Sequence, residues 1–171
     1  MEASPKLTTP AYIILWIVRT VEEATPYEMK QYAANSVDHF WSVRHAQFYS
    51  EPDRLVDQGY LTVRREQGGR RRKHYRLTDA GADVLAAWQR SPSRGRVGLR
   101  DEAMLKLFVG TDPAGLAEEQ IPIVEQHLRE LEDALATVGE FMTPAQRLGV
   151  TMGIEVEKTI IAHWQKIAAL D

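Results

Sequence analysis

The stretch YLTVRREQGGRRRKHYRLTDAG, residues 60–81 of a 171-residue sequence, decides the fold. Apolar and polar side chains alternate over residues 60–66, which is the period of a β-strand with one buried face. The pair Gly68-Gly69 follows, and adjacent glycines are typical of a tight hairpin turn because such turns require positive φ angles. Residues 71–77 predict a returning strand, so the stretch as a whole predicts a β-hairpin.

A run of four cations, Arg70, Arg71, Arg72 and Lys73, lies directly after the two glycines. The whole chain has a net charge of −3 and a pI near 6.0, so this cluster of positive charge stands within a slightly acidic protein. By itself, a basic run is as often a solvated or disordered tract as a binding surface. Its place at the tip and return strand of a hairpin favours a binding surface, because phosphate binding needs cations held in fixed positions.

Two helices are expected at the start of the chain. Thr9-Pro10 predicts the beginning of the first helix, and the apolar residues 13–18 predict that this helix is central and buried. The segment TPYE, residues 25–28, has the pattern of a capping box and predicts a second helix running to about Asn35.

A third helix is expected to begin after Ser42 and to end near Gly59. Phe48 and Leu55 belong to its apolar side and are predicted to lie in the core. Pro52 falls inside this helix and removes one backbone donor, so a kink or a break is expected near Ser50 to Pro52.

The order of elements predicts a winged helix-turn-helix. Thr78-Asp79 predicts the cap of a fourth helix whose inner side carries Val84, Leu85 and Trp88. Three helices, a hairpin and a further helix form the winged helix-turn-helix plan, in which the third helix enters the major groove of DNA. The expected class is therefore mainly α with a small β-hairpin, followed by a helical C-terminal domain.

The charge distribution indicates two parts with different roles. Residues 1–98 contain 15 lysines and arginines against 11 aspartates and glutamates, a net charge of +4. Residues 99–171 contain 6 against 13, a net charge of −7, which together with +4 reproduces the total of −3. We predict a DNA-binding domain at 1–90, a linker at 91–98 and a helical dimerisation domain at 99–171.

The composition excludes several classes of site. The chain has no cysteine, which rules out disulfides and thiolate metal sites and suits the cytoplasm. We see no signal peptide and no apolar run long enough for a membrane span, so no membrane partner is expected. The five histidines show no paired metal-ligand spacing, and no nucleophile elbow or phosphate-binding glycine loop occurs. We therefore expect no catalytic residues, no metal and no cofactor, and an enzyme is the less favoured alternative.

The C-terminal part predicts further helices. Residues 100–110 indicate an amphipathic helix ending at Gly110, and Asp112-Pro113 opens a segment that Pro122 should end or bend. TPAQ, residues 143–146, predicts the capping box of the last helix.

Apolar residues recur at spacings of 3 and 4 along this region, as in a coiled coil. Such a seam could pack within its own chain or against a second copy, and its length favours a homodimer. The expected dimerisation residues are Val124, Leu128, Leu131, Leu135, Val138, Met152, Ile160 and Trp164.

Four motifs resemble the PadR family of bacterial transcriptional regulators. They are YEMK at 27–30, FYSEPDRLVDQGYL at 48–61, HYRLTDAG at 74–81 and RDEAMLKLF at 100–108. Together they cover about residues 8 to 110, and beyond that the resemblance rests on helical pattern alone.

The resemblance implies a homodimeric repressor that binds an inverted-repeat operator and is released by a small molecule. The chain has Pro26 where many family members have glycine before the Tyr-Glu pair. Many members also have proline directly after the recognition-helix tyrosine and leucine two residues later, whereas this chain has Ser50 and then Pro52. These departures concern the shape of the third helix.

The candidate DNA contacts come from three segments. Arginine and glutamine side chains can pair with base edges, whereas hairpin cations bind phosphates or the minor groove. For each residue the alternative is a solvent-facing side chain. The candidates are Tyr27 and Lys30 from the second helix, Ser42, Arg44, His45, Gln47 and Tyr49 from the third, and Arg64, Arg70, Arg71, Arg72 and Lys73 from the hairpin.

The four tryptophans, Trp16, Trp41, Trp88 and Trp164, are expected at helical positions in the core. As a hypothesis, Trp16 and Trp88 border an apolar cavity for a small hydrophobic or aromatic effector, because the family often senses such molecules. The alternative is a DNA-binding or protein-interaction module without effector control.

Overall fold

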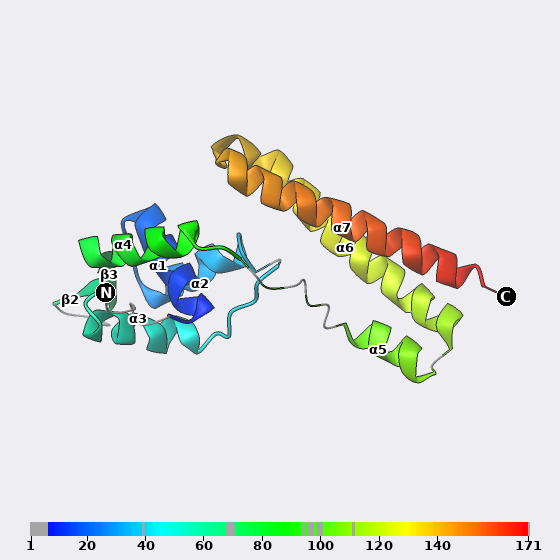
Figure 1. The fold of residues 1–171 in the computed structure, drawn as a ribbon, viewed down its shortest axis with the longest axis horizontal. Helices are drawn as coiled ribbons and strands as arrows, with labels where there is room; N and C mark the ends of the chain where they lie inside the picture. Colours follow the sequence, from blue (N-terminus) through cyan, green and yellow to red (C-terminus); the bar gives the residue numbers. More distant parts are fainter. Residues whose placement is uncertain are drawn as a thin grey trace. The chain divides into compact units, whose positions relative to one another are not determined.

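The computed structural model describes residues 7–38, 40–67, 71–93, 95, 98, 101–110 and 112–170. The chain divides into two compact units, Met1–Gly95 and Arg96–Asp171 (Figure 1). This division falls inside the linker predicted at 91–98, whose exact bounds stay a prediction.

The N-terminal unit is a winged helix, as the order of predicted elements indicated. Four helices accompany a small antiparallel sheet, with strand order β1-β3-β2 (Figure 1). Its elements are α1 (Thr9–Val21), β1 (Glu23–Ala24), α2 (Pro26–Ala34), α3 (Gln47–Asp57), β2 (Leu61–Arg65), β3 (Lys73–Leu77) and α4 (Asp79–Arg90).

The core of this unit surrounds α1, which packs against α2, α3, α4 and the sheet. Ile14 and Leu15 of α1 are fully buried, because nearly every side of this helix is apolar. Phe48 and Leu55 of α3 are also buried, which confirms their predicted place in the core.

Helix starts follow the predicted caps with one shift. Thr8, and not Thr9, caps α1 by accepting a hydrogen bond from the Ala11 backbone N–H, so Pro10 follows one position inside the helix. Thr25 and Glu28 form the predicted capping box of α2, and Thr78 caps α4. The first cap was misplaced because adjacent threonines offer the same side-chain oxygen.

The predicted start of the third helix is wrong. Helix α3 begins at Gln47, after Ala46, which has no capping side chain, and it continues through Pro52 to Asp57. Ser42, Arg44 and His45 therefore precede the helix instead of lying on it. Val43 of this preceding segment is buried in the core although the segment is not helical.

The hairpin pairs residues 61–65 with 73–77 in antiparallel register, from Leu61 opposite Leu77 to Arg65 opposite Lys73. The return strand begins at Lys73 and not at Arg71 as predicted, because Arg71 has a φ of 45°, outside the extended region. The predicted Gly68-Gly69 turn and Arg70 lie outside the described residues.

The strand β1 was not predicted. Glu23 pairs with Arg76 and Ala24 with Tyr75, which adds a third strand on the far side of β3 from β2. Two residues carry no periodicity, so this strand exists only because the end of α1 brings their backbone beside β3.

The C-terminal unit is helical. A short helix precedes a long antiparallel pair, α6 and α7 (Figure 1), and within the described residues no helix has the length and apolarity to cross a membrane. The elements are α5 (Glu102–Val109), α6 (Pro113–Val138), the 3-10 turn η1 (Gly139–Phe141) and α7 (Pro144–Ala168).

Two predictions for this unit have opposite outcomes. The helix end at Gly110 is confirmed by its left-handed φ of 97°, and Thr143 with Gln146 forms the predicted capping box. Pro122 does not end its helix, because α6 continues unbroken through it while packing along α7. One missing backbone bond is a small loss against the packing of a 26-residue helix.

The expectation of four core tryptophans is only partly correct. Trp164 is buried, whereas Trp41 is 48% exposed in the segment between α2 and α3 and is not helical. Trp88 is 41% exposed near the end of α4. A tryptophan's size alone does not determine its burial, because its position in the element decides which side it faces.

Candidate nucleic-acid interface

A groove of about 730 Å³ joins three elements that the sequence predicted to bind DNA. It lies between the start of α2, one face of α3 and the turn end of the hairpin formed by β2 and β3, here called the wing. Its lining residues are Thr25, Pro26, Tyr27, Glu28, Tyr49, Arg71, Arg72, Lys73 and Tyr75.

Helix α2 presents Tyr27 at the edge of this groove. The capping box fixes the first turn, since Thr25 Oγ1 accepts from the Glu28 N–H while the Glu28 carboxylate accepts from the Thr25 N–H. This backbone bond from Thr25 is the largest cause of the lowered pKa of Glu28.

Tyr27 is 58% exposed, and its Oη accepts from Gln31 Nε2 at 2.9 Å. The Tyr27 hydroxyl proton is therefore directed to another acceptor, such as a phosphate oxygen. Lys30, the other candidate from α2, is half-buried.

Helix α3 supplies Tyr49 to the groove, and Gln47 lies half-buried in its first turn. The rings of His45 and Tyr49 lie 5.6 Å apart, so the segment before α3 and its first turn form one continuous surface. Ser42 and Arg44 are exposed in the same preceding segment. The structure thus keeps these candidates near one another, although only two of the five are helical.

The wing cations fall into two groups. Arg71 and Arg72 are exposed and line the groove. Lys73 differs from them, because its Nζ lies 2.5 Å from Asp53 Oδ2 on α3. Arg70 lies outside the described residues.

Asp53 accepts a second bond from the same strand. The hydroxyl of the fully buried Tyr75 donates to Asp53 Oδ1 at 2.7 Å. The hydrogen bond from Lys73 is the main cause of the lowered pKa of Asp53, and burial is the main cause of the raised pKa of Tyr75. The carboxylate and the phenol therefore keep their ionised and neutral forms near neutral pH.

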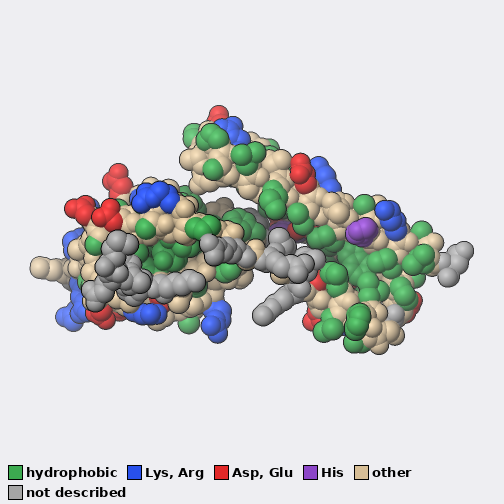
Figure 2. All heavy atoms as spheres, viewed as in Figure 1, with side chains coloured by type: hydrophobic (Ala, Val, Ile, Leu, Met, Phe, Trp, Pro, Cys, Tyr) green, Lys and Arg blue, Asp and Glu red, His purple; other side chains and the backbone are tan. Residues whose placement is uncertain are grey.

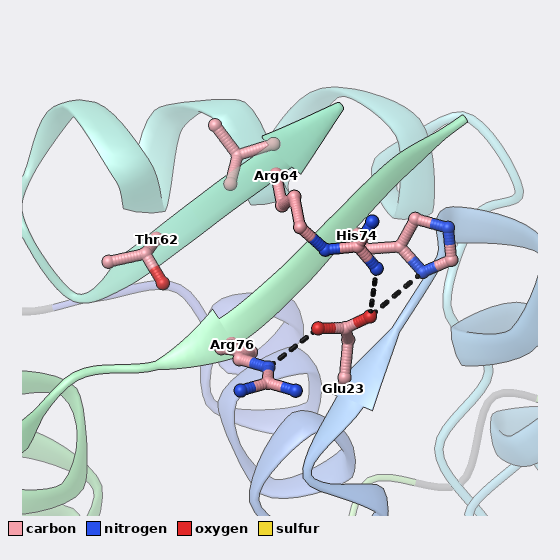
Figure 3. Close-up of a pocket in the computed structure, with 6 residues that line it drawn as sticks. Glu23, Thr62, Arg64, His74 and Arg76 are labelled. Atoms are coloured by element: carbon pink, nitrogen blue, oxygen red, sulfur yellow. Dashed lines mark hydrogen bonds and ion pairs between the residues drawn. The ribbon is translucent and has the colours of Figure 1, made fainter. Parts of the chain in front are cut away.

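Glu23 of β1 holds cations on the other face of the sheet from Lys73 and Tyr75 (Figure 3). Its Oε1 lies 2.6 Å from Arg64 Nη2 and 3.2 Å from His74 Nδ1, and its Oε2 accepts from Arg76 Nε at 2.6 Å. The hydrogen bond from Arg64 is the largest cause of the lowered pKa of Glu23. The predicted DNA contact Arg64 is thus engaged within the protein, beside a hollow of about 290 Å³.

Sequence reasoning missed both carboxylates. Nothing in the local pattern marks Glu23, because its partners come from strands about 40 and 50 residues further along the chain. Asp53 did have a signal, since an acidic residue on a helix expected to face DNA needs a compensating cation.

Comparisons with known proteins agree with this geometry. Residues 14–87 match the Transcriptional regulator PadR-like family. The Negative transcriptional regulator PadR of Bacillus subtilis (strain 168) is 28% identical over 174 residues, covering 93% of this chain and 95% of that protein.

The match to the PadR-like family lies within the N-terminal winged helix, and the similarity to Bacillus subtilis PadR extends over most of the chain. The structure of Bacillus subtilis PadR in complex with operator DNA superposes with a TM-score of 0.81 at 27% identity, covering 95% of this chain and 98% of that one. The structure of the same protein in complex with p-coumaric acid gives a TM-score of 0.75 at 26% identity, covering 93% and 96%. The family resemblance expected from the four motifs is confirmed.

In this PadR-like chain the two candidate effector tryptophans each contact a tyrosine. Trp16 meets Tyr32 edge-on at 5.5 Å, and Trp88 stacks on Tyr12 at 4.6 Å. Both pairs lie within the N-terminal unit, so both indoles have aromatic partners of their own.

The predicted dimerisation residues of the PadR-like chain divide between two environments. Leu131 and Trp164 are buried within their own chain, and Val124 and Ile160 pack against the core around Trp164. Leu128 and Leu135 are half-buried, whereas Val138 and Met152 are exposed. Part of the predicted seam is therefore used between α6 and α7 of one chain.

Other apolar side chains of the C-terminal unit are open to solvent. Figure 2 shows apolar side chains gathered on the surface of this unit. The most exposed are Phe108, at 90%, and Phe141, at 81%, with Val109 and Leu148 close behind.

Proposed function

We propose that this chain binds double-stranded operator DNA through the groove between α2, α3 and the wing. The observation that carries the proposal is the meeting of Tyr27, Tyr49, Arg71 and Arg72 in one groove of a winged helix. The similarity to Bacillus subtilis PadR, whose structure includes operator DNA, supports it.

Within this proposal the elements have different tasks. Helix α3 and the segment before it read base edges through Arg44, His45, Gln47 and Tyr49, because an α-helix fits the major groove. The wing arginines bind phosphates, which adds affinity and fixes the register without selecting a sequence.

The chain acts as a homodimer in this proposal. The exposed apolar side chains of α5, η1 and α7 exceed what a monomer normally leaves open to water. A twofold protein would bind an inverted repeat with half-sites about 34–36 Å apart, or a multiple of that spacing.

Regulation is proposed to be repression in the cytoplasm, relieved by a small aromatic molecule. The support is the description of the Bacillus subtilis relative as a negative regulator and its structure with p-coumaric acid. Trp16 and Trp88 remain the proposed effector-responsive residues. A PadR-like chain without effector control is the alternative, and no catalytic role is proposed.

The test begins with duplexes selected by the full chain from a random-sequence pool. Binding to a selected duplex should weaken with salt, with a log-log slope of about −0.9 for each phosphate neutralised. No selection of any duplex, or affinity that does not respond to salt, would contradict DNA binding.

The effector is tested on the same complex. Addition of p-coumaric acid and related phenolic acids should release the duplex and quench tryptophan fluorescence in the wild-type chain, and less so in Trp16→Phe and Trp88→Phe. If a broad panel leaves both signals unchanged, the module without effector control is the better description.

A further inference from the structure

Asp53 connects helix α3 to the wing through both of its carboxylate oxygens. Oδ2 contacts Lys73 Nζ at 2.5 Å, and Oδ1 accepts from Tyr75 Oη at 2.7 Å. Lys73 and Tyr75 are two residues apart on β3, so their side chains leave the same face of the strand. One carboxylate thus contacts the central strand of the sheet at two points.

The Lys73–Asp53 ion pair is too exposed to add much to the stability of the fold. The side chains of Lys73 and Asp53 are 33% and 46% exposed, and ion pairs in such positions contribute little to folding free energy. Their effect on position is larger, because they tie the side of the DNA-facing helix to the turn end of a two-stranded projection.

The contact also changes the charge that DNA would meet. An unpaired carboxylate on α3 would repel the phosphates beside the groove, and Lys73 compensates it. Among the described residues, no carboxylate lies within ion-pair distance of Arg71 or Arg72, so these two keep their charge available.

We propose that Asp53 is a positioning residue that makes α3 and the wing meet a DNA half-site as one rigid unit, and that it withholds Lys73 from phosphate. The proposal rests on the proposed DNA binding and deepens it by naming what sets the register between base reading and phosphate binding. Binding sites lose specificity when their parts are held loosely, since contacts then form one at a time instead of together.

The test is a double-mutant cycle of Asp53→Asn and Lys73→Met in the full chain. Two probes are used, the duplex selected by the wild-type chain and a scrambled duplex of the same length, and affinities are measured over a range of salt concentrations. Asp57→Asn is the matched control, because it removes the same charge from the last turn of α3 and no bond joins Asp57 to the described part of the wing.

Asp53→Asn should make the salt slope steeper by about 0.9, because the released Lys73 neutralises one more phosphate. The ratio of affinities for the selected and scrambled duplexes should fall roughly tenfold, about the effect of one mismatched base pair. Lys73→Met alone should leave the slope unchanged, whereas in the Asp53→Asn background it should reverse the extra 0.9. Asp57→Asn should change neither the slope nor the ratio.

Two results would overturn the proposal. One is a slope that becomes shallower by about 0.9 in Lys73→Met alone, because Lys73 would then bind a phosphate in the wild-type complex. The other is a wild-type affinity ratio in a folded Asp53→Asn variant. If Asp53→Asn does not fold, the salt slope of Lys73→Met still tests whether Lys73 is withheld from phosphate, since this variant changes only a partly exposed side chain. Failure of the wild-type chain to select any duplex would instead contradict the proposed function.

Discussion

Glu23 and Asp53 organise the cations of the wing, and each carboxylate accepts bonds from more than one partner. Their partners include Arg64 and Lys73, two of the residues that the sequence predicted to contact DNA. Arg71 and Arg72 have no such partner among the described residues. The basic run is therefore not uniform, and the two exposed arginines are the better candidates for the proposed phosphate contacts.

Replacing Arg71 and Arg72 together with alanine should weaken binding to selected and scrambled duplexes alike. The salt slope should become shallower by about 0.9 for each phosphate that is no longer neutralised, because these cations position the protein without reading bases. Fluorescence anisotropy with both duplexes over a range of salt measures this. Arg129→Ala with Arg147→Ala removes equal charge from the C-terminal unit and should leave the slope unchanged. A variant that loses affinity only for the selected duplex would show that the wing arginines read bases.

Acid should destabilise the sheet through Glu23 and Glu66. Both carboxylates have lowered pKa values, Glu23 chiefly through the hydrogen bond from Arg64 and Glu66 through that from His74. Their stabilisation is complete above the ordinary pKa of 4.5 and is lost as pH falls through the lowered folded-state value.

In urea denaturation followed by circular dichroism, Glu23→Gln should therefore lose less stability than wild type between about pH 5 and about pH 3. Glu118→Gln, an exposed change in α6 whose carboxylate bonds to none of the described residues, serves as the control and should follow the wild-type curve. Equal losses in Glu23→Gln and wild type would show that the Glu23 ion pairs do not contribute.

At the scale of the element, the packing of α4 against the start of β2 requires a residue that the local helix pattern does not favour. Helix α4 lies against the start of β2 at Gly81, where an added Cβ would be 2.2 Å from the Tyr60 carbonyl oxygen. Tyr60 O also accepts from the Thr78 N–H, so this carbonyl is already held in place. The glycine is therefore needed for space, although its position in a helix would otherwise favour alanine.

Gly81→Ala should destabilise the N-terminal unit by about 3 kcal/mol, because either the helix or the strand must move. Gly149→Ala is the matched control, since no atom lies within 4 Å of its added Cβ and alanine is the better helix former by roughly 0.5–1 kcal/mol. Denaturant midpoints of the two variants would show the contrast. A stable Gly81→Ala variant would mean that α4 can shift without loss.

At the scale of the whole molecule, the exposed apolar side chains of the C-terminal unit are the proposed dimer contacts. Phe108 is 90% exposed on α5, and the α6–α7 pair already uses Leu131 and Trp164 internally. A second copy is the proposed partner for what remains open. The predicted seam residues Val138 and Met152 are among the exposed ones.

Phe108→Asp should shift the chain from dimer to monomer in analytical ultracentrifugation, because a charge buried without a partner strongly opposes association. Affinity for the selected duplex should fall at least tenfold, since a monomer engages one half-site. Gln165→Asp introduces the same charge at an exposed polar position of α7 and should leave assembly unchanged. A dimer in Phe108→Asp would place the interface elsewhere.

Local patterns account for much of the fold. Capping threonines predicted the starts of α2, α4 and α7, and alternation predicted β2, because caps and strand periodicity depend on residues close in sequence. Two differences involve packing between elements that are separate in sequence. Helix α3 begins late beside the buried Val43, and β1 forms because α1 ends beside β3.

By itself, the sequence determined the order of the helices and the hairpin, the basic wing and the family resemblance, since each depends on residue type and spacing along the chain. Only the tertiary structure decided which cations of the run REQGGRRRKHYRLT remain available. Lys73 meets a carboxylate from α3 and Arg64 meets one from β1, and both carboxylates lie 20 or more residues away in the chain. Such pairings depend on how helices and strands pack, so no local pattern could have shown that Asp53 and Glu23 engage Lys73 and Arg64 and leave Arg71 and Arg72 exposed.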